Sequence, residues 1–233
     1  MIGEVGLAVA LFTGTLALYE GFRALQARAR AQRAWLNPLV LTIVCVGLAL
    51  RALHLPLATY REATRPLSWL VGPSVVALAY VLDARLDELR DRARAVLVSL
   101  TLGAVSGAFT AVLVARALGA SRVVVASLAP KSATTAIAAP VAARLGGDAS
   151  LAAVVVVLVG VVGALIGPAL LRALGVRDRH AFGLAMGAAA HIVGTARARE
   201  EGAAEEGASA AAMVIHGVLT AVLAWVAVRV AGP

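Results

Sequence analysis

Residues 150–171 read SLAAVVVVLVGVVGALIGPALL and contain no charged side chain. A segment that crosses the hydrocarbon core of a bilayer as a helix needs about 20 apolar residues. Backbone amides find no water in that core, so they must bond within the segment itself, as they do in a helix. We therefore predict a transmembrane helix over residues 150–171.

The composition of the whole chain agrees with a membrane protein. Of its 233 residues, 61% are hydrophobic and only 15% are charged, whereas soluble domains average about 45–50% apolar and about 25% charged residues. The formal charge of +8 comes from arginines that stand between apolar stretches, where they set membrane topology. This placement argues against a nucleic-acid partner. The single cysteine, Cys45, excludes an intramolecular disulfide.

Further uncharged stretches predict the other spans. Together with residues 150–171, the candidates are 5–19, 34–50, 66–82, 95–115, 123–143, 180–196 and 207–228, of which 123–143 is interrupted by one lysine. We predict an all-α fold, a polytopic transmembrane helical bundle of about seven or eight segments, in a single integral membrane domain over residues 1–233. No basic residue precedes the first stretch, so we expect a retained helix rather than a cleaved signal peptide.

Arginine clusters in the loops indicate an orientation. The clusters within residues 23–33 and 85–94 both follow odd-numbered spans, which places both in the cytoplasm and the N-terminus outside. The opposite side also holds arginines, at positions 51, 61 and 65, so the asymmetry is small. We expect a multi-pass protein of the bacterial inner membrane, whose orientation beyond residue 123 is left open.

An internal repeat is one interpretation of two similar stretches. Each has a proline, then a long apolar span, then the tetrapeptide Arg-Ala-Leu-Gly, which ends at Gly119 and at Gly175. The repeat halves would be about 67–119 and 124–175, and repeats are common in transporters. The alternative is chance, because Arg-Ala-Leu occurs four times in this alanine-, arginine- and leucine-rich chain.

The segment Pro130-Lys131-Ser132-Ala-Thr134-Thr135 is the strongest candidate for a binding site. Lys131 is the only lysine of the chain and lies within an apolar stretch, where an ionisable group costs at least about 2.5–3.5 kcal/mol. Pro130 suits the first position of a helix, so we predict a broken helix whose second half starts there and points its positive end at a cavity. Lys131, Thr134 and Thr135 would share a face of it and cradle a small anion. The alternative is a lysine that extends to the membrane interface.

A second candidate is the helix around His191. Gly183, Gly187, His191 and Thr195 recur every four residues, with Gly194 beside them. The glycines favour the close approach of another helix, which we expect them to serve structurally. His191 would then either bond across that packing or contact a substrate.

Two further proline motifs are expected to start helices. Pro73, with Ser74 after it, would open a partner half-helix across the site if the repeat is real, and Asn37 would cap a helix that begins at Pro38. The final span carries Ser209, Met213, His216 and Thr220 on one stripe, which we regard as weak evidence of function.

The sequence contains no motif for an enzyme or a metal site. No acidic residue lies in the middle of an apolar span, and we find no zinc-like Cys/His spacing, phosphate loop or nucleophile elbow. We therefore predict a non-enzyme with no cofactor and no metal ligands.

Taken together, these motifs resemble the LrgB/CidB family of bacterial membrane proteins, to which the plant plastidial glycolate/glycerate transporter is related. The resemblance covers nearly the whole chain and is strongest in LAPKSATTAIA from Leu128 and GLAMGAAAHIVGTAR from Gly183. The chain departs from the family pattern at Ala136, where a second proline is usual, at Ala189, where Ser or Thr is usual, and at His216, where the family residue is not ionisable.

The resemblance implies two functions. Bacterial members are described as holin-like or antiholin-like proteins that modulate murein hydrolase export and cell lysis, together with a small LrgA/CidA-like membrane protein. The plant relative implies transport of small carboxylates such as glycolate, glycerate or pyruvate. A lone lysine at a proline-broken helix suits the second function better, since a holin requires no anion site. A homo-oligomer is compatible with either function.

We therefore interpret the chain as an inner-membrane carrier for small organic acids, with a holin-type protein as the alternative. Lys131 would hold the carboxylate, and Ser132, Thr134 and Thr135 would bond its other oxygens. His191, with Thr195 and Ser74 nearby, would line the path, and His191 would bind a coupled proton because it titrates near neutral pH.

Overall fold

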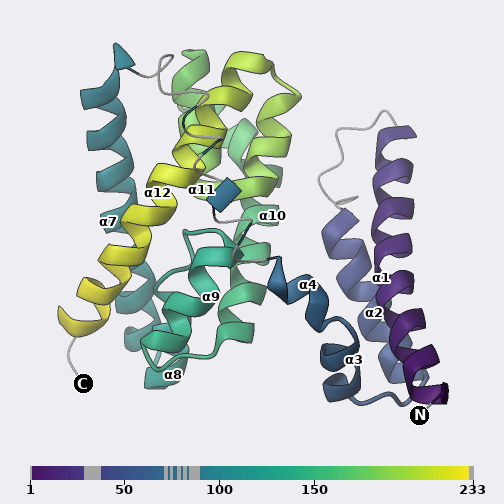
Figure 1. Cartoon of the computed structure of the whole chain (residues 1–233). Coiled ribbons are helices and arrows are strands. Elements are labelled where there is room, and N and C mark those ends of the chain that lie inside the picture. The colour runs from purple at the N-terminus through teal and green to yellow at the C-terminus, as the bar shows by residue number, and fades with distance from the viewer. Residues whose placement is uncertain are drawn as a thin grey trace. The chain divides into compact units, whose positions relative to one another are not determined.

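The computed structural model describes residues 2–28, 38–70, 73, 76–77, 80, 83 and 90–230, and all regular structure in these ranges is helical (Figure 1). The chain forms two compact units, Met1–Pro73 and Ser74–Pro233. In the described ranges, four helices are long and apolar enough to cross a membrane. The predicted all-α membrane class is therefore confirmed.

Among its described residues, the first unit contains one helix long enough to span a membrane and three shorter ones. They are α1 (Ile2–Arg28), α2 (Pro38–Ala52), α3 (Leu57–Ala63) and α4 (Arg65–Trp69). Helix α1 packs against α2 and α3, and the hydroxyls of Thr15 and Tyr60 lie 3.2 Å apart. The apolar part of α1, Val5–Arg28, is long enough for a full span. The first span is therefore longer than the uncharged stretch 5–19 from which it was predicted. Helix α2 begins at Pro38 as predicted, and Asn37 lies outside the described residues.

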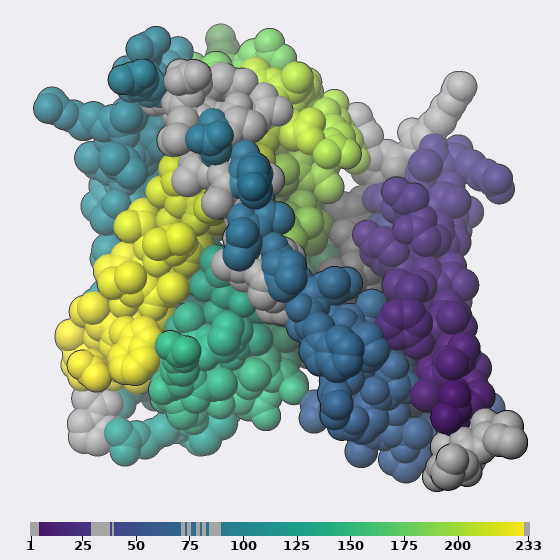
Figure 2. All heavy atoms as spheres, in the orientation of Figure 1, coloured from purple at the N-terminus to yellow at the C-terminus, as the bar shows by residue number. Residues whose placement is uncertain are grey.

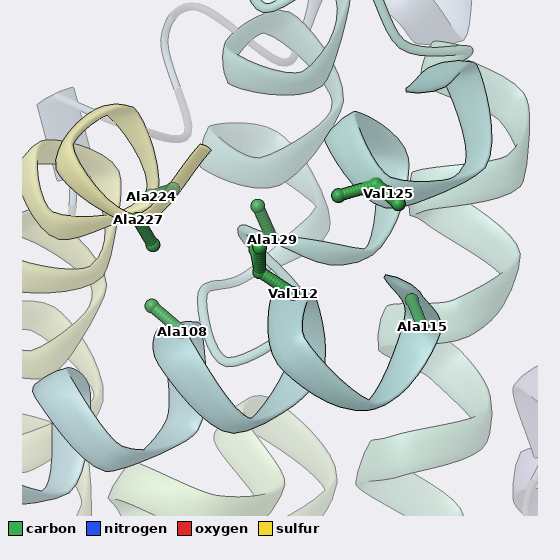
Figure 3. Packing of buried hydrophobic residues seen from close by; sticks show 7 residues of the cluster. All are labelled: Ala108, Val112, Ala115, Val125, Ala129, Ala224 and Ala227. Atoms are coloured by element: carbon green, nitrogen blue, oxygen red, sulfur yellow. The ribbon is translucent and has the colours of Figure 1, made fainter. Parts of the chain in front are cut away.

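The second unit contains three long helices, α7 (Ala93–Ala117), α10 (Ala149–Ala173) and α12 (Ala203–Val230). At about 1.5 Å per residue each exceeds the roughly 30 Å of a bilayer core. Small side chains let their backbones approach closely. Figure 3 shows one such contact. A face of α7, with Ala108, Val112 and Ala115, packs against Ala224 and Ala227 of α12 and against Val125 and Ala129 of the segment that follows α7 in the chain.

The outer faces of these helices carry large apolar side chains that are exposed. Val222 of α12 and Leu158 of α10 are 61% and 57% exposed, and α12 forms the yellow surface in Figure 2. In water such faces would be unfavourable, whereas lipid chains solvate them. The exposed apolar surface is therefore consistent with a membrane environment.

The first broken segment, hairpin 1, is formed by α8 (Arg122–Leu128) and α9 (Thr135–Arg144). Neither helix is long enough to cross a membrane. After α9 the chain returns to α8, because a Cβ on Gly147 would lie 2.7 Å from the Ser127 nitrogen and the Asp148 amide donates to the Ser127 hydroxyl at 2.8 Å. The predicted break between residues 129 and 135 is confirmed.

The second broken segment, hairpin 2, is α11 (Arg179–Arg199), in which His191 has non-helical angles of φ 52° and ψ −131°. A straight helix would separate Phe182 from Ala198 by about 24 Å, yet both pack in one buried cluster with Met186. The half after His191 therefore folds back along the half before it. The prediction that residues 180–196 cross the membrane as one helix is wrong, because the chain reverses at His191.

The two hairpins start from opposite ends of α10 and reach its middle. Hairpin 1 closes at the N-cap of α10, Asp148. Hairpin 2 closes at the other end, where Arg172 of α10 pairs with Glu201. The tip of hairpin 2 reaches the centre of α10, because a Cβ on Gly160 would lie 3.3 Å from the Ala190 carbonyl oxygen. The tip of hairpin 1 meets the centre of α7 in the same way, through a close contact between Ser132 and Gly107.

An ion pair joins the base of hairpin 2 to α7. Asp178 caps α11 by accepting from the Ala181 amide at 2.8 Å, and Arg92 contacts the same carboxylate at 3.0 Å. The Ala181 amide and the Arg92 guanidinium hold the pKa of Asp178 below its ordinary value. Falling pH through that lowered pKa would neutralise Asp178, so this contact between α7 and hairpin 2 is present at neutral pH and is lost only in acid.

Helices α7 and α10 resemble each other in length and ending. Both have 25 residues, and each is followed by a glycine with a left-handed φ of 74°, Gly119 and Gly175. Most of the residues before α7 that the repeat requires lie outside the described ranges. The internal repeat therefore stays a prediction.

Candidate functional site

The tip of hairpin 1 consists of turns rather than the start of a helix. The Lys131 amide donates to the Leu128 carbonyl at 3.0 Å and the Ala133 amide to the Pro130 carbonyl at 2.9 Å. Helix α9 begins only at Thr135, with Thr134 as its N-cap. The prediction that a half-helix starts at Pro130 is wrong. The backbone on either side of Pro130 forms hydrogen bonds between residues three apart, which are typical of turns.

Lys131 lies in this tip, half-buried, with its Nζ 3.2 Å from the hydroxyl of the neighbouring Ser132. Within the described part of the chain, no carboxylate pairs with it. Because Ser132 contacts Gly107 in the middle of α7, Lys131 lies level with the middle of α7 rather than near either end of that helix. A cation at that level of a membrane-spanning helix, without a counter-ion, marks a candidate functional site.

The other polar residues of the tip have different environments. The Ser132 side chain is 7% exposed, and its carbonyl accepts a hydrogen bond from His216 Nδ1 at 3.0 Å. Thr134 is 2% exposed, and its hydroxyl has no hydrogen-bond partner. Thr135 is exposed and belongs to the first turn of α9. Lys131, Thr134 and Thr135 therefore do not share one helical face, and Thr135 is apart from the buried cluster.

His191 forms the tip of hairpin 2. It is 3% exposed, and neither ring nitrogen has a hydrogen-bond partner within reach, although the Ser132 backbone and the charge of Lys131 are close enough to influence the ring. The residues predicted to form one stripe with it separate at this turn. Gly183 and Gly187 contact α12 from the arm before His191, and Thr195, on the arm after it, bonds the His191 carbonyl and the Ser209 hydroxyl, each at 2.9 Å.

The glycines of hairpin 2 permit close packing, as predicted. A Cβ on Gly187 would overlap the Ser209 carbonyl of α12, and one on Gly183 would overlap the Glu205 carbonyl. A Cβ on Gly194 would overlap the Met186 carbonyl of the opposite arm. Gly183 and Gly187 thus fix hairpin 2 against α12, while Gly194 holds its two arms together.

The backbone of His191 is strained. Its φ of 52° and ψ of −131° match the first central position of a type II′ turn, which glycine favours. A side chain there costs about 1–3 kcal/mol, and such residues cluster at functional sites. Since glycine would fit this backbone better, the strain makes the imidazole of His191 a candidate functional group.

We predict that His191→Gly is more stable than His191→Ala by about 1–2 kcal/mol, because both lose the ring but only glycine relieves the strain. Thermal unfolding of the two purified variants in detergent would measure the difference. Equal stability, or a more stable alanine variant, would show that the turn is not strained. Both variants should lose transport, if the imidazole contacts substrate.

His216 is the site residue for which the sequence offered only weak evidence. It lies in the middle of α12, 3% exposed, and contacts a residue 84 positions away in the tip of hairpin 1. The available signal was a histidine within an apolar span at a position where the resemblance predicts no ionisable residue. Of the other predicted residues, Ser74 lies outside the described residues, and Pro73 is helical but isolated among them, so the partner half-helix stays a prediction.

The features to compare with known proteins are the two hairpins, with Lys131 at one tip and His191 at the other, packed among three long helices. The sequence model of the LrgB-like family matches residues 15–230. The chain belongs to the LrgB-like family. As a member of that family it is a multi-pass membrane protein, in agreement with its apolar helices.

Relatives of this LrgB-like chain cover most of its length. A Haemophilus influenzae uncharacterized protein is 30% identical over 90% of each chain. The Bacillus subtilis uncharacterized protein YxaC is 30% identical over 91% of this chain and 89% of its own. The antiholin-like protein LrgB of Bacillus cereus is 28% identical over 80% of this chain and 81% of its own. No solved structure matches this LrgB-like chain.

Proposed function

We propose that this LrgB-like protein carries small organic acids across the bacterial cell membrane. The observation that supports this proposal most is that the tips of the two hairpins lie at the middle of the long helices and close to each other, with Lys131 in one tip and His191 in the other. Carriers commonly bind substrate near the midplane, between discontinuous helices. A lysine without a paired carboxylate at that depth suits an anionic substrate.

The chemistry of the tips fits a carboxylate. The second arm of each hairpin begins at its tip, so both helix N-termini direct their positive ends towards the centre. The Lys131 ammonium supplies the full positive charge. The Thr134 hydroxyl and both nitrogens of His191 are buried without partners, and unpaired buried polar groups are costly, so a hydroxyl or carbonyl oxygen of the substrate would complete their bonding.

This arrangement suggests acids of two or three carbons with a second oxygen function. Ser132, whose hydroxyl is 3.2 Å from the ammonium, would help to hold the carboxylate. Thr195 bonds Ser209 and the His191 carbonyl, so it would support the tip of hairpin 2 rather than contact substrate. Glycolate, glycerate and pyruvate, which the resemblance suggests, have the required groups.

The alternative is an antiholin-like role in murein hydrolase export and lysis, with a small LrgA/CidA-like partner. The name of the Bacillus cereus relative, antiholin-like protein LrgB, favours it. A protein of that kind would need no buried cation and no strained histidine, so the alternative leaves both features of this chain without a purpose.

We predict that purified protein in liposomes exchanges labelled glycolate, glycerate or pyruvate for the same unlabelled acid inside, with saturation and with competition among the three. Liposomes without protein provide the background, and acetate, which lacks the second oxygen function, should compete at least about tenfold more weakly, as expected for the loss of one buried hydrogen bond of about 1.4 kcal/mol. Absence of exchange for all three acids, with release of a trapped large sugar polymer, would favour the pore-like alternative.

A further inference from the structure

The ring of His216 lies between the carbonyl groups of two other elements. Its Nδ1 is 3.0 Å from the Ser132 carbonyl oxygen in the tip of hairpin 1. The Gly103 carbonyl of α7 faces the same ring, and Nε2 lies 3.5 Å from where a Cβ on Gly103 would stand. A Cβ there would make only an ordinary van der Waals contact, so the ring lies directly against the backbone of Gly103. Thr220, one turn further along α12, is within 3.4 Å of Nδ1.

The two carbonyl groups beside the ring can stabilise its doubly protonated form, which burial alone disfavours. A carbonyl oxygen only accepts hydrogen bonds, so each ring nitrogen that bonds one must carry a hydrogen. The neutral imidazole has one N–H and can serve one carbonyl, whereas the imidazolium has two and can serve both. A proton on His216 therefore completes a second hydrogen bond.

His191 has the opposite environment. Neither of its nitrogens meets an acceptor in hydrogen-bond geometry, so a proton added there would leave two buried donors unpaired. The sequence suggested His191 for the coupled proton because it titrates near neutral pH. The geometry instead leaves His191 for the substrate and gives the better proton site to His216.

We infer that His216 binds a proton that crosses the membrane together with the carboxylate held by Lys131. The inference rests on the proposed carrier function and deepens it by naming the coupling ion and its site. The charged or titratable groups that face His216 are Lys131 in hairpin 1 and His191 in hairpin 2. In the described part of the chain, α7 contributes only Gly103 and uncharged neighbours to this contact.

The charge of Lys131 would couple the two binding events. In the empty site its ammonium repels a second positive charge on His216. A bound carboxylate neutralises the ammonium, so the proton then binds more readily. By reciprocity, a proton on His216 strengthens carboxylate binding by the same factor. One monocarboxylate and one proton cross together, and transport moves no net charge.

The test measures proton uptake on substrate binding to the purified full-length protein in detergent, in a weak buffer with a pH indicator near pH 7. Pyruvate is the ligand. The wild type should take up close to one proton for each pyruvate bound. His216→Asn should bind pyruvate with almost no proton uptake, because asparagine can donate to the Ser132 carbonyl but does not titrate.

Two matched histidine variants separate this role from others. His54→Asn, in an exposed loop of the first unit, should behave as the wild type. His191→Asn should weaken pyruvate binding but keep proton uptake per pyruvate. Wild-type uptake in His216→Asn, or its loss in His191→Asn alone, would overturn the inference and leave the carrier proposal intact.

A second measurement covers the case in which His216→Asn does not fold. In wild-type protein labelled with nitrogen-15 in histidine, pyruvate should convert one imidazole signal to the doubly protonated form, and a folded His216→Gln variant should lack that signal. No such conversion in the wild type would also overturn the inference. Failure of the wild type to bind or exchange any of the three acids would refute the carrier proposal itself, and the inference with it.

Discussion

Replacing Lys131 with alanine should reduce carboxylate exchange to the background of empty liposomes. The ammonium is the one full positive charge in the tip of hairpin 1, and within the described residues no acidic side chain pairs with it. Removing one partner from a buried charge pair costs about 2–5 kcal/mol, which corresponds to a loss of about 30-fold to several thousandfold in substrate affinity. Exchange of labelled pyruvate in liposomes measures the loss.

The same variant should insert and purify normally, because no opposite charge is stranded when the lysine is removed. Lys131→Arg is the matched variant that keeps the charge. It should also impair exchange, since a planar guanidinium does not fit the site of a compact ammonium, next to Ser132 at 3.2 Å. If both variants exchange pyruvate at wild-type rates, Lys131 does not bind the substrate and the main support for a carrier is lost.

Replacing Gly187 with alanine should destabilise the protein by at least about 3 kcal/mol, because overpacking a well-filled core already costs about 1–3 kcal/mol. The added Cβ would overlap the Ser209 carbonyl of α12, and a backbone atom cannot rotate away as the end of a flexible side chain can. The methyl group would push hairpin 2 from α12 and displace His191. Thermal unfolding and size-exclusion chromatography in detergent measure the effect.

A matched glycine gives the opposite expectation. Gly47 lies within α2, and a Cβ there would meet no atom within 4 Å. Gly47→Ala should therefore be neutral or stabilise the protein by up to about 1 kcal/mol, because alanine favours a helix. If Gly187→Ala is as stable as Gly47→Ala, hairpin 2 does not pack against α12 as described.

Local features of the sequence were sufficient for the class of fold and for one of its breaks. Long uncharged stretches require helices in lipid, whatever their neighbours are. Pro130 lacks an amide hydrogen and clashes with the preceding turn, so a break near it follows from the residue alone. The residue at which the next helix begins could not be predicted from Pro130 alone. It depends on which carbonyl groups accept hydrogen bonds from the amides of the turn around Lys131.

The reversal at His191 could not be predicted in this way. The apolar pattern of residues 180–196 is the same for one crossing helix and for two arms folded together. From the sequence, a backbone with positive φ is expected at glycine, and Gly187 and Gly194 are both close to the turn. The residue with positive φ is nevertheless His191. Two tight contacts hold the chain in that turn: Gly194 packs on Met186 of the opposite arm, and Gly187 packs on α12.

The helical membrane class, the helix break near Pro130 and the unusual character of Lys131 were all predictable from the sequence. Each of them depends on the chemistry of a residue and its near neighbours. The packing of the helices was needed to show that the tips of the two hairpins lie at the middle of α7 and α10, and that His216 contacts the tip that carries Lys131. His216 bonds a carbonyl 84 positions away. Contacts of that range depend on how several helices pack at once, and no local pattern of side chains encodes them.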